Sequence, residues 1–296
     1  MDDEKKRALT GAGAALAAFS LWSAIPIYFK AVSHIPAFEI LAHRVVWTVV
    51  FLGIVISLKG SMSNVFAVFQ NKKLLFTLML SSLLISSNWL VFIWAVAHDR
   101  VLEASLGYFT TPIVSVALGL FFLREKLHNL QWFAVGLSIL SVSNLVWSHG
   151  DIPWVAISVS ITFGLYGLVR KIAEVDAFSG LFIETALIVA PMLAYLFIIG
   201  INGVGFYGPS DLKITGLLMM AGLITATPLI LFAVATKRLR LSTLGFFQYI
   251  TPTGQFLLAV FLYNEPFLDA HLITFGIIWL ALAIYSFDSF TSYNRR

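Results

Sequence analysis

The chain has 296 residues, of which 59% are hydrophobic and 11% are charged, and its formal net charge is +4. A soluble globular chain carries roughly 25% charged residues, so this composition excludes a fold surrounded by water and predicts an integral membrane protein. At about 20 apolar residues per span, the length accommodates roughly ten transmembrane helices and leaves no separate soluble domain. The basic residues are scattered among the loops and form no basic face, which indicates the lipid bilayer and not nucleic acid as the partner.

Ten apolar runs follow one another along the chain. A charged start, Met1 to Arg7, precedes a first run that is too long for the hydrophobic part of a signal peptide, so we expect no cleavable leader. The predicted spans are 8–28, 37–58, 74–97, 104–123, 130–147, 153–169, 178–199, 214–235, 243–263 and 271–287. The fold class is therefore predicted to be an all-α membrane protein with ten transmembrane helices.

The loop charges predict the orientation of these spans, because cytoplasmic loops are enriched in Lys and Arg. With the N-terminus in the cytoplasm, fifteen basic residues fall inside and three outside, while Arg44 lies within a span. The inside set is Lys5, Lys6, Arg7, Lys59, Lys72, Lys73, Arg124, Lys126, Arg170, Lys171, Lys237, Arg238, Arg240, Arg295 and Arg296; the outside set is Lys30, Arg100 and Lys213. This asymmetry predicts an even number of spans with both termini in the cytoplasm.

An internal repeat appears when the sequence is shifted by 140 residues. The matched pairs include Ala37-Phe38 with Ala177-Phe178, Thr111-Pro112 with Thr251-Pro252, Arg100 with Arg240, and Glu125 with Glu265. Each half holds five spans, an odd number, so the second half must enter the membrane from the opposite side. We predict two five-helix repeats of inverted orientation, residues 1–150 and 151–296. Inverted repeats recur in secondary transporters, which work by alternating access around a site at the midplane.

Five segments of the chain resemble a known family. They are Ile-Tyr-Phe-Lys at 27–30, Glu-Ile-Leu-Ala-His-Arg-Val-Val-Trp at 39–47, Asn-Trp-Leu-Val-Phe-Ile-Trp-Ala at 88–95, Glu-Ala-Ser-Leu-Gly-Tyr-Phe at 103–109, and Tyr-Gly-Leu-Val-Arg-Lys at 166–171. With these motifs the chain resembles the drug/metabolite transporter superfamily, specifically EamA-type exporters and their RarD branch. The resemblance covers nearly the whole chain. It implies a ten-helix fold in the bacterial inner membrane and efflux of small organic molecules, without specifying a substrate.

Arg44 is a charged residue inside an apolar run. It lies about eight residues into the second span, roughly 12 Å deep, where an ionised side chain is costly unless it is paired or faces water. The repeat places Glu184 at the equivalent position of the seventh span, within about 6 Å of the same depth from the opposite face. We therefore hypothesise an Arg44–Glu184 interaction near the midplane. Two interpretations stay open: a substrate anchor or protonation-controlled latch, and a static salt bridge.

Further candidates for a substrate pocket are polar or aromatic residues within the spans. Asn88 and Trp89 lie in mid-span in the third helix, where an Asn either binds a ligand or bonds neighbouring helices together. Tyr108 and Gln248 are repeat counterparts, each four residues before a Pro, and suit either a ligand across the two-fold axis or helix packing. The last two candidates are Trp22 and Tyr166 in the first and sixth spans, where aromatic residues also serve plain packing.

The sequence contains no metal-ligand spacing of His, Asp and Glu, no Gly-rich nucleotide loop and no nucleophile–base motif. We therefore expect no metal, no cofactor and no enzyme activity. The leading hypothesis is a secondary transporter that exports small amphipathic metabolites or drugs, chloramphenicol-like compounds included, with protons as the coupling ion through Glu184. The alternatives are a passive uniporter of amino-acid-like solutes and a membrane-embedded enzyme acting on lipid-linked substrates.

Overall fold

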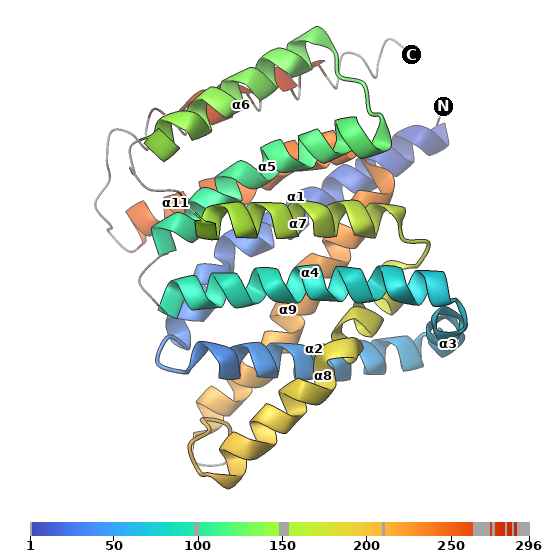
Figure 1. The fold of residues 1–296 in the computed structure, drawn as a ribbon, viewed down its shortest axis with the longest axis vertical. Helices are drawn as coiled ribbons and strands as arrows, with labels where there is room; N and C mark the ends of the chain where they lie inside the picture. The colour runs from blue at the N-terminus through green and yellow to red at the C-terminus, as the bar shows by residue number, and fades with distance from the viewer. Residues whose placement is uncertain are drawn as a thin grey trace.

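The computed structural model describes residues 2–97, 101–147, 154–208 and 211–262, together with residues 273, 276–281, 283–285 and 287–288. Within these residues the chain is helical and contains no β-strand. In Figure 1, α2, α4, α7, α5 and α6 lie one above another and α9 crosses them at an angle. The helices are α1 (Asp2–Ala31), α2 (Ala37–Leu58), α3 (Met62–Gln70), α4 (Lys72–Ala97), α5 (Val101–Leu123), α6 (Asn129–Trp147), α7 (Trp154–Ile172), α8 (Ala177–Ile201), α9 (Leu212–Arg238), α10 (Leu241–Gln248) and α11 (Ile250–Phe261).

The predicted spans correspond closely to these helices. The first eight spans are α1, α2 and α4 to α9, and the bounds of the second span coincide with those of α2. The ninth is divided into α10 and α11. The tenth is described only in part, and its described residues, 273, 276–281, 283–285 and 287, are helical. Six of the helices, namely α1, α2, α4, α7, α8 and α9, are long and apolar enough to cross a membrane.

The α3 helix was not predicted, because its nine residues lie in what the hydropathy pattern indicates is a loop. Gly60 has a φ of 65°, a left-handed conformation that a glycine adopts without steric cost and that ends α2. After this turn, α3 packs on α4 and α8. Val65 and Val68 provide its buried contacts.

The break between α10 and α11 has a local cause in Pro252. A proline lacks the backbone N–H, and its ring clashes with the carbonyl four residues earlier, here that of Gln248, where α10 ends. The repeat counterpart, Pro112, lies inside α5, which continues without a break. The interruption places Gln248 and Thr251 at the wall of a central cavity.

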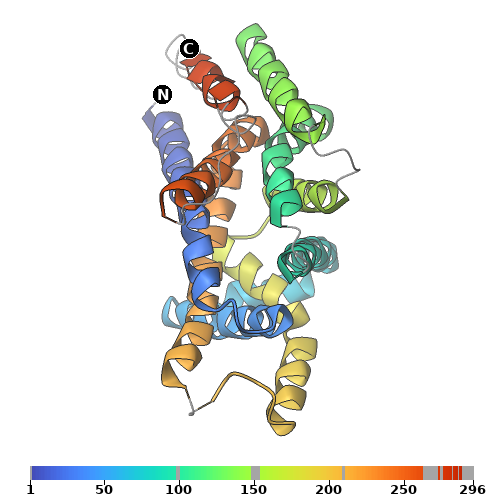
Figure 2. The same cartoon turned by 90° about the vertical axis from the view of Figure 1, so that its left-hand side faces the viewer.

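Helices from the two halves of the sequence are interleaved. The α2 helix packs against α8 and α9, α5 packs against α7 and α10, α1 packs against α9 and α11, and α4 packs against α7. Figure 2 shows α1 and α9 side by side, although they are far apart in the sequence. The centre of the molecule is therefore built from both halves.

One close approach is between α2 and α9, at Gly222. A Cβ atom on Gly222 would lie 2.3 Å from the carbonyl carbon of Trp47, so only a glycine permits this packing. The Thr48 hydroxyl donates a hydrogen bond to the Gly222 carbonyl at 3.3 Å. Small residues of this kind let membrane helices approach closely. The contact brings Thr225, one turn further along α9, next to Arg44.

Candidate functional site

A central cavity lies among α1, α2, α4, α5, α7, α9, α10 and α11, and its volume is about 80 Å³. Six of the eight residues that the sequence singled out line this cavity: Trp22, Arg44, Asn88, Trp89, Tyr108 and Gln248. They come from five different helices. The two remaining candidates, Tyr166 and Glu184, belong to a separate buried cluster.

Arg44 extends from α2 into the cavity and is 8% exposed. Its Nε donates a hydrogen bond to the Thr225 hydroxyl at 2.9 Å. The guanidinium carbon lies 4.8 Å from the centre of the Trp89 ring and 5.7 Å from that of Phe29, distances typical of cation–π contacts. Among the described residues, no carboxylate lies within ion-pair distance of this charge.

The expected ion pair between Arg44 and Glu184 is therefore wrong. The partner of Glu184 is Arg170, whose Nη1 lies 3.3 Å from Oε1, and both side chains are fully buried. The Ser81 hydroxyl from α4 donates to the same oxygen at 2.5 Å. Similar depth in the membrane does not place two side chains face to face, because that also depends on the rotation of each helix about its axis.

Arg170 is the functional candidate that sequence reasoning missed, because its position beside Lys171 suggested a cytoplasmic loop. It lies in the last turn of α7 and is 1% exposed. Gly180 on α8 makes room for it, since a Cβ atom there would clash with the guanidinium. The repeat contained a signal: a shift of 140 residues matches Arg170 with Lys30, so this position is basic in both halves.

Tyr166 connects the ion pair to the cavity. Its hydroxyl lies near the Glu184 carboxyl, and its ring stacks on Phe232 with centres 5.8 Å apart. The Phe232 ring in turn packs against that of Trp22 in the cavity wall, with ring centres 5.7 Å apart. Tyr166 is therefore part of an aromatic cluster between the two polar sites and does not line the cavity.

The amides of Asn88 and Gln248 are held in different ways. The Asn88 Nδ2 donates to the Val159 carbonyl at 2.9 Å and to the Thr162 hydroxyl at 3.0 Å, so both of its hydrogens join α4 to α7. The Gln248 Oε1 accepts a hydrogen bond from the Ser115 hydroxyl at 3.2 Å. Its Nε2 is buried and has no hydrogen-bond partner among the described residues. A buried donor without an acceptor is costly, so Gln248 offers the cavity an unused N–H group.

Tyr108 of α5 also lines the cavity. Its ring packs against that of Phe92 with centres 5.7 Å apart. The cavity thus combines several aromatic faces with a guanidinium, three amides and a phenol, a lining typical of a site for a small organic molecule.

Comparisons with known proteins agree on one family. Residues 9–147 match the model of the EamA-like transporter family. The chain is 42% identical over 292 residues to Protein RarD of Escherichia coli (strain K12), covering 99% of both chains. It is 34% identical to Protein RarD of Streptomyces exfoliatus, covering 94% of this chain and 88% of that one. It is 31% identical to the Chloramphenicol-sensitive protein RarD of Pseudomonas aeruginosa, covering 93% and 92%.

A solved crystal structure has the same fold. Its TM-score is 0.70 at 15% sequence identity, and the alignment covers 95% of this chain and 98% of that one. At this identity the likeness establishes the fold alone.

Proposed function

Because this chain belongs to the EamA-like transporter family, together with the RarD proteins, we propose that it exports small amphipathic organic acids by alternating access through the central cavity. The chain is a multi-pass protein of a bacterial inner-membrane family. The observation that carries the proposal is the pair of donors in the cavity, the Arg44 guanidinium and the Gln248 Nε2, for which the described protein supplies too few acceptors.

These donors favour a substrate with a carboxylate. A buried charge is stable only when it is paired or hydrated, and the contacts of Arg44 are a hydroxyl and two aromatic rings. A carboxylate is the natural partner of a guanidinium, because it can accept two parallel hydrogen bonds. The rings of Trp22, Trp89 and Tyr108 would then cover an aromatic or aliphatic body. Substrates of this kind include aryl carboxylates and aromatic amino acids.

Alternating access is supported by the symmetry of the packing. In the predicted repeat, α1 corresponds to α7, α4 to α9, and α5 to α10 together with α11. Exchanging the repeats therefore converts the contact of α1 with α9 into that of α7 with α4. It likewise converts the contact of α5 with α7 into that of α10 and α11 with α1. All of these contacts are present. The family model also matches one half of the chain by itself. A cavity of about 80 Å³ is smaller than the pockets of roughly 300–1,000 Å³ that bind drug-sized ligands, so substrate entry requires the halves to move apart.

Proton coupling is proposed at the Arg170–Glu184 pair. Protonation of Glu184 would remove its charge and its attraction to Arg170, and so would loosen α7 from α8. In the alternative, a passive uniporter, the pair only holds these helices together and flux ignores a pH gradient.

Counterflow in proteoliposomes tests the proposal with three radiolabelled probes: 3-phenylpropionate, phenylalanine and chloramphenicol. Chloramphenicol is included because the name of the Pseudomonas aeruginosa relative refers to it. We expect counterflow of the two carboxylates and a loss of at least tenfold in their apparent affinity in Arg44→Gln, with partial retention in Arg44→Lys. Preference for chloramphenicol over both carboxylates would contradict the substrate class. A lack of counterflow for every probe, with turnover of a lipid-linked substrate, would favour the enzyme alternative.

A further inference from the structure

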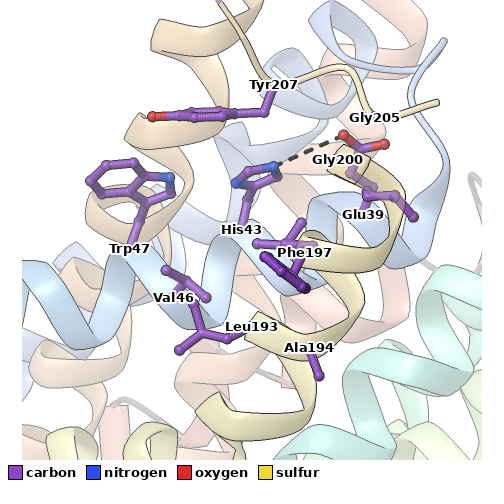
Figure 3. Close-up of a pocket in the computed structure, with 12 residues that line it drawn as sticks. Glu39, His43, Val46, Trp47, Leu193, Ala194, Phe197, Gly200, Gly205 and Tyr207 are labelled. Atoms are coloured by element: carbon purple, nitrogen blue, oxygen red, sulfur yellow. Dashed lines mark ion pairs between the residues drawn. The ribbon is translucent and has the colours of Figure 1, made fainter. Parts of the chain in front are cut away.

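A second hollow, separate from the central cavity, lies between α2 and α8 and has a volume of about 640 Å³ (Figure 3). It is at the end of the molecule where α2 begins and α8 ends. Its walls are mainly apolar, with Val46 on one side and Leu193 and Phe197 on the other. Leu193 is 49% exposed and Phe197 is 69% exposed, so the groove opens sideways toward the lipid.

One end of the groove is polar. Figure 3 shows His43 between Glu39 and Trp47 on α2, with the ring of Tyr207 lying over it. The His43 and Tyr207 ring centres are 5.0 Å apart. The Glu39 Oε1 accepts a hydrogen bond from the Phe206 backbone N–H at 2.7 Å, which ties the loop after α8 to the start of α2.

His43 has hydrogen-bonding capacity that the described protein does not use. It is 3% exposed, and neither ring nitrogen has a hydrogen-bond partner among the described residues. Its Nε2 lies 4.0 Å from the Glu39 Oε1, which is too long for a hydrogen bond. This distance is, however, less than twice the length of a charge-assisted hydrogen bond, which is about 2.8 Å. One ammonium group placed between the two atoms can therefore bond to both.

The groove is not a consequence of the two-fold repeat. The 140-residue shift matches Glu39 with Ser179, His43 with Ile183 and Trp47 with Leu187. The second half therefore has no corresponding carboxylate or imidazole. These polar residues need an explanation other than the architecture of the fold.

We propose that this groove binds an amphipathic amine, with its ammonium group between Glu39 and His43 and its apolar tail along Leu193 and Phe197. Among the described residues that line the groove, Glu39 is the one with an ordinarily charged side chain, and none is Lys or Arg. The faces of Tyr207 and Trp47 add cation–π attraction for the same charge. A free single-chain amine fits better than an aminophospholipid, because no basic side chain lines the groove to pair with a phosphate.

The test is equilibrium binding of radiolabelled dodecylamine to the full chain in phosphatidylcholine nanodiscs, with dodecanol as the matched uncharged probe. We expect saturable binding of one dodecylamine per protein and no saturable binding of dodecanol. Glu39→Gln should weaken dodecylamine binding at least tenfold, although its amide oxygen can still accept the Phe206 N–H. Equal binding of the two probes, or an unchanged affinity in Glu39→Gln, would overturn the proposal.

A second variant blocks the groove without removing a charge. A Cβ atom on Gly200 would meet no atom within 4 Å, so the backbone there accepts a side chain, and the Leu of Gly200→Leu would fill part of the groove. We expect it to abolish dodecylamine binding and to leave the melting temperature within a few degrees of the native value. Saturable binding that survives in this variant would place the amine elsewhere. If phosphatidylethanolamine nanodiscs abolish dodecylamine binding, the occupant is a lipid headgroup and the free amine is the wrong assignment.

Discussion

Arg170 and Glu184 form an ion pair across the α7–α8 hairpin in which the Nη1 to Oε1 distance is 3.3 Å and neither side chain has any exposed surface. The pair is only partly satisfied by the described protein. The Arg170 Nε and Nη2, the Glu184 Oε2 and the Ser179 hydroxyl are all buried without a hydrogen-bond partner among the described residues. A cluster of this kind is strongly destabilised when one partner is removed, and it is a suitable place for a change of protonation.

Removing only one member of this pair should lower stability. In Glu184→Gln the amide can still bond to Ser81, but Arg170 becomes a buried charge without a counter-ion, which costs about 3–5 kcal/mol. We expect a clear drop in the melting temperature of the protein in detergent. The double variant Arg170→Met/Glu184→Leu removes both charges and should recover most of the loss. A Glu184→Gln protein that melts like the native one would show that the pair contributes nothing.

Transport should depend on pH through the same pair. If protonation of Glu184 releases Arg170, a pH gradient drives counterflow in the native protein and has no effect in Glu184→Gln. The measurement is initial counterflow of 3-phenylpropionate with and without the gradient, at a temperature where both proteins are folded. Equal responses to the gradient in the two proteins would assign the pair a purely structural role.

The sequence was sufficient to predict most of the helices, because long apolar runs bounded by charged loops have few alternative structures in a membrane. Six of the eight residues that it singled out line the cavity, because polar side chains in mid-span, such as Asn88, Tyr108 and Gln248, are expensive in lipid and face the interior. The hydropathy pattern could not predict the α3 helix, because its nine residues are far fewer than a membrane span needs.

The partner of Glu184 could not be predicted for a different reason. Depth along the membrane normal follows from residue counting, whereas contact depends on the rotation of each helix, which tertiary packing fixes. The space left by Gly180 accepts the Arg170 guanidinium, and Arg44 is directed instead toward Thr225 by the close crossing at Gly222. Residue counting also placed Arg170 in a loop after the sixth predicted span, whereas it lies in the last turn of α7.

Thr225 should control how firmly Arg44 is held. Thr225→Val keeps the shape of the side chain and removes the acceptor for the Arg44 Nε. A hydrogen bond to a charged group is worth about 1.5–3 kcal/mol, so the affinity for 3-phenylpropionate should fall roughly 10- to 100-fold. Thr227→Val on the same helix is the control, because the Thr227 hydroxyl bonds to the Leu223 carbonyl of its own helix. Equal effects of the two variants would contradict a specific role for Thr225.

The close crossing of α2 and α9 should depend on glycine at position 222. Gly222→Ala places a Cβ atom 2.3 Å from the Trp47 carbonyl carbon, which forces the helices apart and should cost about 1–3 kcal/mol or more. Gly216→Ala is a matched control in the same helix, because a Cβ atom there meets no atom within 4 Å. We expect a lower melting temperature only for Gly222→Ala. Alanine favours a helix more than glycine does, so a similar fall in both variants would contradict a specific packing role for Gly222.

The final prediction concerns the sign of the charge that the central cavity accepts. Gln248→Glu replaces the unpartnered Nε2 with a carboxylate oxygen in the cavity that Arg44 lines. The new carboxylate would repel an acidic substrate and would compete with it for Arg44, so the affinity for 3-phenylpropionate should fall more than tenfold. Gln248→Leu removes the donor without adding charge and should cause a smaller loss. Because chloramphenicol carries no carboxylate, any binding of it should change similarly in both variants. If Gln248→Glu and Gln248→Leu weaken 3-phenylpropionate equally, the substrate is not held through its charge and Arg44 serves the fold instead.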